Sequence, residues 1–310
     1  MATYIGQRLA VLIPVVVLVF SIVFGIMHAL PGDPVQLMLA GAEAGVTTPE
    51  RIAELRKSMG LDRPLYLQYG GFIVHALRGD LGQSIRFQAP VNDLIFVASL
   101  QTFQLSLAGM AAALLIGIPL GFIAGLYENS WADSAAMVVS LLGVSMPLFW
   151  LALLLILAVS IHLQWLPAIS GGQPRGIILP ALTLGFVAAG LISRLMRASL
   201  IEALRHDYIR TALAKGLRWR AVMAKHALKN ALIPVITVAG LQFGGMLSGA
   251  VITETVFSRP GLGSLIVKAI LWHDYPLIQG AVLLTSVSYV LVNLLIDVLY
   301  AWIDPRIKYA

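Results

Sequence analysis

The chain has 310 residues, of which 59% are hydrophobic and only 12% charged, and its mean hydropathy is +0.87. A soluble domain of this length needs much more polar surface, so the composition excludes that class and predicts a membrane protein. The absence of cysteine excludes disulfides, thiolate zinc sites and a cysteine nucleophile, and the net charge of +6 indicates basic loops that orient the chain in a membrane rather than a nucleic-acid surface.

Six apolar stretches are long enough to cross a bilayer whose hydrocarbon core is about 30 Å thick. They cover residues 9–30, 100–126, 135–161, 177–193, 231–252 and 277–296. The first is longer than a typical signal-peptide core and has no clear small-x-small cleavage site before Pro31, so we expect it to be retained as a helix. Pro119 and Pro147 are expected to kink the second and third helices.

Residues 31–98 are predicted to form a small helical domain outside the membrane. Thr48, Pro49 and Glu50 have the residue types that begin a helix, and Gly60 stands where that helix would end. A second short helix is predicted from apolar residues at helical spacing. These are Leu65, Tyr69, Phe72, Ile73, Ala76 and Leu77. We expect this apolar stripe to serve ordinary packing rather than a ligand.

Glycines four residues apart allow two helix backbones to approach closely. They occur at Gly117, Gly121 and Gly125, at Gly240 and Gly244, and at Gly245 and Gly249. Packing within the chain and a subunit interface both fit this spacing, and we favour packing within the chain.

Basic residues crowd the segment 194–230, where only Glu202 and Asp207 oppose them. Because positive residues stay on the cytoplasmic side, this segment is predicted to be a cytoplasmic loop. With six spans, both termini are then cytoplasmic too, and the loop 31–98 lies outside.

Several kinds of chemistry find no support. As drawn, the six spans contain no Asp, Glu, Lys or Arg, which argues against an autonomous ion-coupled carrier, although carbonyls and hydroxyls alone can build a sodium site. There is no Gly-Lys-Ser/Thr phosphate loop, no Gly-x-Ser-x-Gly elbow and no pair of histidines four apart. We therefore expect no catalytic residue, no metal site and no cofactor held by this chain.

The most informative segment of the cytoplasmic loop reads Asp-Tyr-Ile-Arg-Thr-Ala-Leu-Ala-Lys-Gly-Leu over residues 207–217. Asp207 is predicted to cap a short helix, Ala212 and Ala214 to leave room for a close contact, and Gly216 to end the helix. An interfacial helix neutralised by anionic lipid is the alternative interpretation.

This segment resembles the cytoplasmic signature of binding-protein-dependent ABC importer permeases. That signature has Glu-Ala-Ala, three residues and Gly, and here Arg210-Thr211-Ala212 precedes Gly216 in the same way. His226-Ala227-Leu228-Lys229 replaces the usual apolar-x-Leu-Pro ending, and this departure is similar to the branch of dipeptide, oligopeptide, nickel and glutathione permeases. Further stretches resemble that branch over nearly the whole chain. They are residues 31–34, 60–65, 79–84, 253–263, 274–276 and 304–306.

The resemblance implies an all-α membrane protein with six transmembrane helices, a type I ABC importer permease core and a small helical extracytoplasmic loop domain. It implies the division into residues 1–30 (first helix), 31–98 (outer loop) and 99–303 (core, with the coupling loop 194–230). Expected partners are a second, homologous permease subunit, two ATPase subunits that hold ATP and magnesium, and an extracytoplasmic substrate-binding protein, with no nucleic acid. The expected location is the bacterial inner membrane.

Two groups of residues are assigned roles on this basis. Contact with an ATPase is expected from Asp207, Tyr208, Arg210, Thr211, Ala212, Lys215 and Gly216. An outer gate is expected from Glu254, Phe257 and Arg259, for which a plain structural turn is the alternative. The expected function is import of di- or oligopeptides or a related small peptide such as glutathione. The alternatives are a nickel or other non-peptide importer of the same family, a stand-alone carrier or channel, and a membrane enzyme or scaffold.

Overall fold

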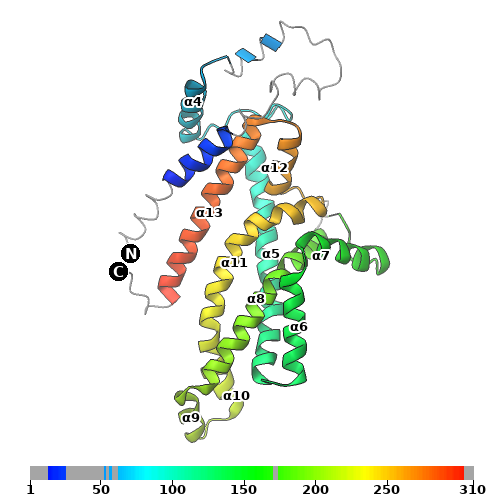
Figure 1. Ribbon diagram of the computed structural model, residues 1–310, viewed down its shortest axis with the longest axis vertical. Helices are drawn as coiled ribbons and strands as arrows, with labels where there is room; N and C mark the ends of the chain where they lie inside the picture. The colour runs from blue at the N-terminus through cyan, green and yellow to red at the C-terminus, as the bar shows by residue number, and fades with distance from the viewer. Residues whose placement is uncertain (1–12, 26–51, 54–55, 58–61, 170–173, 304–310) are drawn as a thin grey trace. The chain divides into compact units, whose positions relative to one another are not determined.

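The computed structural model describes residues 13–25, 52–53, 56–57, 62–169 and 174–303 (Figure 1). Within these ranges the regular elements are helices, with one isolated bridge between Gln83 and Pro90. The chain divides into two compact units, which are described separately: unit 1 is Met1–Gln101 with Gly261–Leu291, and unit 2 is Thr102–Pro260 with Val292–Ala310. The division at residues 30 and 98 that the sequence suggests stays a prediction.

Unit 1 contains the helix Ile13–Gly25, α4 (Leu65–Leu77), the start of α5 (Val91–Leu126), α12 (Leu262–Leu271) and most of α13 (Tyr275–Ile303). Unit 2 contains the rest of α5, α6 (Trp131–Ser145), α7 (Leu148–Leu155), α8 (Ile178–Arg205), α9 (Asp207–Ala214), α10 (Trp219–Val222) and α11 (Leu228–Val256). It also holds two π-helical segments, Ile156–His162 and Met223–Ala227, and a 3-10 turn, Pro174–Ile177.

The predicted spans can be compared with the helices. Among the described residues, four helical stretches are long and apolar enough to cross a membrane: Val91–Leu126, Arg175–Arg205, Trp219–Ser248 and Tyr275–Ile296. They confirm the second, fourth, fifth and sixth predicted spans. The third is present as a bent pair of helices. The count of six stays a prediction, because residues 9–12 and 26–30 of the first span lie outside the described residues.

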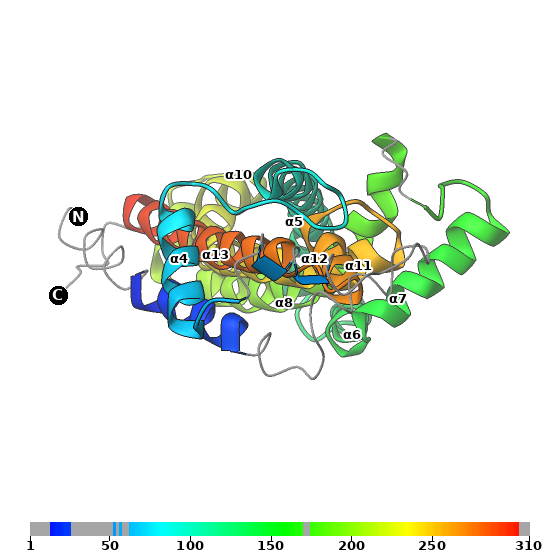
Figure 2. The ribbon, with the colours of Figure 1, turned by 90° about the horizontal axis from the view of Figure 1, so that it is seen from above.

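The third span is broken at Pro147, and this break is sharper than the predicted kink. Trp131–Ser145 and Leu148–His162 meet at 110°, and Figure 2 shows α7 running away from the axis of α6. Pro147 disfavours the helical conformation of the residue before it, and Met146 is accordingly extended, with ψ of 131°. By contrast, α5 continues through Pro119 as one helix of 36 residues.

The fourth span is longer than predicted. The apolar run was expected to end at Arg194, but α8 continues to Arg205. The extension contains two arginines with acidic partners: Arg197 pairs with Asp133 at 2.6 Å, and the exposed Arg205 pairs with Glu128 at 3.0 Å. The spans as drawn contain no charged residue, but α8 continues beyond the fourth of them, and most of the predicted cytoplasmic loop 194–230 is helical.

In unit 1, α4 confirms the second short helix predicted for the outer loop. Its Tyr69 and Phe72 pack on the helix Ile13–Gly25, where the ring of Phe20 stacks on Phe72 at 4.3 Å between centroids. The hydroxyls of Ser21 and Tyr69 are hydrogen-bonded at 2.7 Å. Tyr69 and Phe72 of the stripe thus serve packing, as expected, whereas Leu65 and Leu77 are 55% and 83% exposed. Residues 48–50 and 60, which were predicted to bound the first short helix, lie outside the described residues.

Asp274 joins two of the recognised motifs in unit 1. It is fully buried, and its carboxylate accepts hydrogen bonds from the hydroxyl of Ser84 (2.5 Å) and the backbone N–H of Arg86 (3.1 Å). The backbone N–H of Leu277, in the first turn of α13, also donates to it at 3.3 Å. A buried carboxylate needs such partners, so the motifs 79–84 and 274–276 hold the outer loop to the start of α13.

In unit 2, the first glycine series packs α5 against α8, as predicted. A methyl group at Gly117 would meet Ile192, one at Gly121 would collide with the carbonyl oxygen of Ser193, and one at Gly125 would press on Leu200. Gly245 on α11 differs, because nothing lies within 4 Å of its added methyl group. Packing within unit 2 therefore explains the first series but does not explain Gly245.

Candidate functional site

The predicted short helix of the basic segment is present as α9. It follows α8 after a single extended residue, His206, with ψ of 148°. His206 is the N-cap and makes no side-chain capping bond, so the prediction that Asp207 caps the helix is wrong. Asp207 is instead the first helical residue, where its negative charge interacts favourably with the positive end of the helix dipole and stabilises the helix. Its ion pair with Arg210, at 3.9 Å and fully in solvent, contributes little.

The end of α9 is confirmed at Gly216, where the backbone turns left-handed with φ of 79°. The N–H of Gly216 donates to the carbonyl of Leu213 (2.9 Å), and that of Leu217 donates to the carbonyl of Ala212 (3.3 Å). These two bonds form a Schellman motif, which satisfies carbonyls that the helix end would otherwise leave open. The helix therefore has a defined length and a fixed exit.

One face of α9 is buried in the chain's own core. Ile209 and Ala212 are 3% and 6% exposed and belong to the same apolar cluster as Leu200 of α8 and Val222 of α10. Ala212 was predicted to leave room for a contact with a partner. In the structure its small size instead allows α9 to lie close to its own support, so α9 is held on the end of α8 and on α10.

The other face of α9 and the turn after it are exposed. We call this surface the α9 face, and it combines apolar and basic side chains. Its members are Tyr208, Arg210, Thr211, Leu213, Lys215, Leu217, Arg218, Trp219 and Arg220. Leu213 and Trp219 are 40% and 47% exposed. Tyr, Trp and Arg are the residue types enriched at the centres of protein interfaces, so this surface fits a protein partner.

The predicted gate residues lie at the other end of α11. The fifth span was predicted over residues 231–252, and α11 continues beyond it to Val256, so that Glu254 lies in the last turn of the helix. Glu254 is fully buried, and its Oε1 accepts a 2.5 Å hydrogen bond from the hydroxyl of Thr102 on α5. Phe257 is also fully buried, in a cluster with Ala152 and Leu179.

Arg259 follows a tight turn after α11. Ser258 is left-handed, with φ of 51°, and the N–H of Arg259 donates to the carbonyl of Glu254 at 2.8 Å. The side chain of Arg259 is 4% exposed, so burial lowers the pKa of its guanidinium, while the charge of Glu254 opposes that shift. The turn thus brings all three gate residues into the interior of unit 2.

The two predicted groups are far apart. The α9 face lies beside the start of α11 and the gate residues at its end (Figure 1). At 1.5 Å per residue, the helix Leu228–Val256 is roughly 43 Å long. One continuous helix, which contains Pro234 and bends near its end (Figure 1), therefore connects the two groups.

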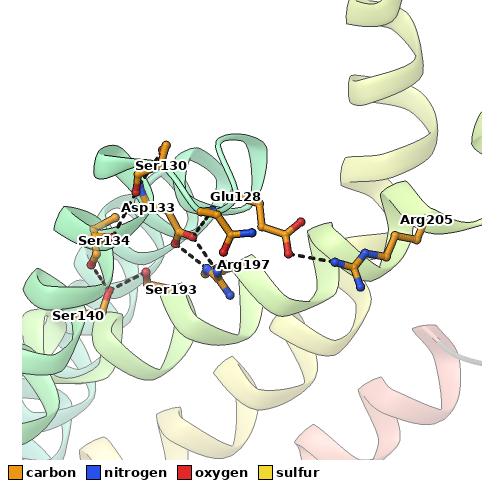
Figure 3. A network of polar contacts seen from close by, with 10 residues as sticks. Glu128, Ser130, Asp133, Ser134, Ser140, Ser193, Arg197 and Arg205 are labelled. Atoms are coloured by element: carbon orange, nitrogen blue, oxygen red, sulfur yellow. Dashed lines mark hydrogen bonds and ion pairs between the residues drawn. The ribbon is translucent and has the colours of Figure 1, made fainter.

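Sequence reasoning missed a polar network on α6 and α8 (Figure 3). Asp133 lies in the first turn of α6, and its two carboxylate oxygens accept hydrogen bonds from Nε and Nη2 of Arg197 at 2.6 and 2.7 Å. Ser130 caps the same helix by accepting from the N–H of Asp133 at 3.3 Å. The pattern Ser130-x-x-Asp133 was the available signal, since a cap residue followed three later by an acid begins a helix.

Metal binding finds no support in the part of the chain that the structure describes, because no group of three or more His, Asp or Glu side chains gathers there.

Comparison with known protein families gives two matches that together cover most of the chain. Residues 117–309 match the model of the binding-protein-dependent transport system inner membrane component. Residues 1–108 match the N-terminal model of the same membrane components.

Two characterised relatives align over their whole length and the whole of this chain. The dipeptide transport system permease protein DppB of Alkalihalophilus pseudofirmus is 41% identical over an alignment of 337 residues. The glutathione transport system permease protein GsiC of Pectobacterium atrosepticum is 43% identical over 309 residues.

Comparison with solved structures identifies the fold of this chain. A chain of the MetNI methionine ABC transporter, from inward facing conformations, superposes with a TM-score of 0.58 at 16% identity, over 68% of this chain and 96% of that one. A chain of an amino acid ABC transporter superposes with a TM-score of 0.53 at 15% identity, over 69% of this chain and 94% of that one. The described helices therefore have the permease fold of ABC importers.

Proposed function

Because the chain belongs to the family of binding-protein-dependent transport system inner membrane components, we propose that it is half of the pathway of an ATP-driven importer and that its α9 face is the contact with an ATPase subunit. The chain is a transport permease and not an enzyme. The observation that carries the contact is an exposed apolar and basic surface on a short helix that the chain itself holds rigidly.

The substrate class follows from the relatives. Full-length permeases for dipeptides and for glutathione are 41% and 43% identical to this chain. We infer a small peptide as the substrate, with nickel or another non-peptide substrate as the alternative within the family.

In the proposed complex, two partner ATPase subunits bind ATP and magnesium. The sequence contains no Gly-Lys-Ser/Thr phosphate loop, and none is needed if the energy enters through α9. A second homologous permease completes the pathway, and an extracytoplasmic binding protein delivers the substrate. The proposed setting is the bacterial inner membrane with both termini in the cytoplasm.

Coupling is proposed to work by rigid displacement. Movement of an ATPase would push or pull α9, and the shared apolar core would pass that movement to α8 and α11. Interfaces of packed helices switch between discrete arrangements rather than deforming smoothly, so such a displacement can select between two states of the pathway.

The gate at the far end of α11 is proposed to respond to that movement. Glu254 bonds α11 to Thr102 of α5, and Phe257 packs against α7 and α8 neighbours. A shift of α11 would therefore disturb this cluster and change the access of substrate. A plain structural turn is the alternative role for these residues.

The test uses the chain purified with its second permease and both ATPases in proteoliposomes, with binding protein present. ATP-dependent uptake of a radiolabelled dipeptide or glutathione, with nickel as a competing substrate, is the expected result. Uptake by this chain alone without ATP would instead support a stand-alone carrier or channel. No flux of any of these substrates with all partners present would support a scaffold.

A further inference from the structure

The helix α6 contacts the rest of unit 2 in a different way from the other helices of that unit. The largest apolar cluster of the described residues joins α5, α8, α9, α10 and α11, and none of its described members lies on α6. A second kind of contact must therefore hold α6 in place.

That contact is a ladder of small and polar residues along α8. A methyl group at Gly143 of α6 would press on the carbonyl of Phe186, and one at Gly190 of α8 would collide with the carbonyl of Ser140. The hydroxyl of Ser140 donates to that of Ser193 at 2.8 Å. Because closely approaching backbones and a hydroxyl–hydroxyl hydrogen bond form this ladder, α6 lies tightly against α8 but gains little apolar burial there.

The ladder ends at the ion pair between Asp133 and Arg197 (Figure 3). The pair is bidentate, and the side chain of Asp133 is only 6% exposed, against 27% for Arg197. The N–H of Asn129 also donates to Asp133 at 2.9 Å, and Asn129 is held left-handed with φ of 62°. A bidentate Arg–carboxylate pair fixes orientation as well as distance, so this end of the ladder is its most directional contact.

Arg197 lies close to α9 along the chain. Arg205 lies eight positions after Arg197 on the same continuous helix, a rise of roughly 12 Å, and His206 then leads into α9. Ile209 and Ala212 of α9 belong to one cluster with Leu200 and Ala203 of α8. Any displacement of α9 is thus carried into the part of α8 that holds Arg197.

We propose that the Asp133–Arg197 pair is the joint that makes α6 follow α9, and that α6 passes this movement through the bend at Pro147 to α7. Both are positioning residues, and the proposal rests on the proposed function, in which α9 receives the movement of an ATPase. Apolar contacts can slide past one another, whereas a part-buried bidentate pair resists sliding because separation leaves the buried carboxylate of Asp133 without its partner.

The test compares Asp133→Asn and Arg197→Gln with the wild type in the reconstituted four-subunit importer. The readout is the number of substrate molecules transported for each ATP hydrolysed. We expect this ratio to fall about tenfold, within the range typical of coupling between two sites. Capture of the ATPases and basal ATP hydrolysis should stay at wild-type levels, because neither residue lies on the α9 face.

The chain offers a matched control in Glu128 and Arg205. Glu128, in the turn just before α6, pairs with Arg205 of the same helix α8 at 3.0 Å, but the two side chains are 36% and 71% exposed. Exposed pairs contribute little, so Glu128→Gln and Arg205→Gln should leave the transport ratio unchanged.

A cross-link separates a mechanical joint from simple support of the fold. The chain contains no cysteine, so Asp133→Cys with Arg197→Cys creates a unique pair. A short bifunctional thiol reagent should restore the transport ratio that the double variant loses, and a monofunctional reagent should not. Arg197→Lys keeps the charge but not the planar fork, so an intermediate ratio is expected even if the neutral variants fold poorly.

Three results would overturn the proposal: a wild-type ratio in Asp133→Asn, no recovery on cross-linking, or loss of ATPase capture by either neutral variant. In the last case the pair would shape the docking surface rather than pass on movement. Failure of the proposed function is a separate outcome, because the wild-type chain itself would then not capture the ATPases.

Discussion

The backbone N–H of Leu217 donates to the carbonyl of Ala212 across the left-handed Gly216, so the end of α9 is closed by backbone alone. No heavy atom lies within 4 Å of a methyl group added at Gly216. A substitution there meets no steric obstacle and is felt only through the backbone conformation. This position therefore tests the rigidity of α9 without disturbing any packing.

The first prediction concerns Gly216→Val. Left-handed backbone costs a residue with a Cβ atom about 1–2 kcal/mol, and more for a β-branched one, so the helix end should fray. We expect loss of both substrate-stimulated ATP hydrolysis and transport. Gly216→Asn is the control, because asparagine tolerates this conformation, and it should keep most of both activities. Equal activity of the two variants would show that the end of α9 need not be rigid.

The second prediction concerns Ala212→Asp, which places a carboxylate in the apolar cluster that supports α9. An unpaired buried charge costs at least a few kcal/mol, so we expect a lower unfolding temperature together with loss of transport. Thr211→Asp, at the exposed neighbouring position, should leave the unfolding temperature unchanged. Thermal unfolding in detergent measures both. If the two variants unfold alike, Ala212 is not part of the support.

The third prediction concerns the α9 face itself. Leu213→Asp and Trp219→Ala remove exposed apolar area, so they should reduce capture of the ATPase subunits without lowering the unfolding temperature. Tyr127→Ala, which removes an aromatic ring that is 56% exposed on the α5–α6 turn, is the control. A pull-down of the ATPases distinguishes them. Normal capture by both α9 variants would leave α9 as a lipid-facing basic segment.

The fourth prediction concerns Glu254. Glu254→Lys would place a second buried cation beside Arg259 and remove the acceptor of Thr102. We expect transport to fall by more than tenfold, since unpaired buried charge costs several kcal/mol and 1.4 kcal/mol is a factor of about ten. Thr102→Ser keeps the hydroxyl and should preserve transport. Wild-type transport and binding-protein docking in Glu254→Lys would favour a plain structural turn.

The fifth prediction concerns topology. Single cysteines can be placed in this cysteine-free chain at Leu77, which is 83% exposed on α4, and at the exposed Lys215. A membrane-impermeant thiol reagent added from outside should label position 77 and not position 215, because the basic segment is expected to stay cytoplasmic. The reverse pattern would invert the proposed orientation.

Several features followed from the sequence because they depend on neighbouring residues. Hydropathy alone located the apolar spans that the described helices confirm, since a bilayer of fixed thickness demands a fixed length of apolar chain. Pro147 predicted a bend and Gly216 a helix end, because the backbone preferences of these residues act locally. Motifs spread along the chain were enough to indicate the family.

Only the tertiary structure decided which charges lie within helices and which surfaces are free. Arg197 and Arg205 were assigned to a loop, because hydropathy gives no information on their pairing with Asp133 and Glu128, which lie more than sixty residues away in the sequence. Ala212 was placed toward a partner, because eight residues of helix do not reveal which face the rest of the chain covers. Contacts between residues distant in sequence set both outcomes, and a local sequence pattern does not indicate which distant residues will contact it.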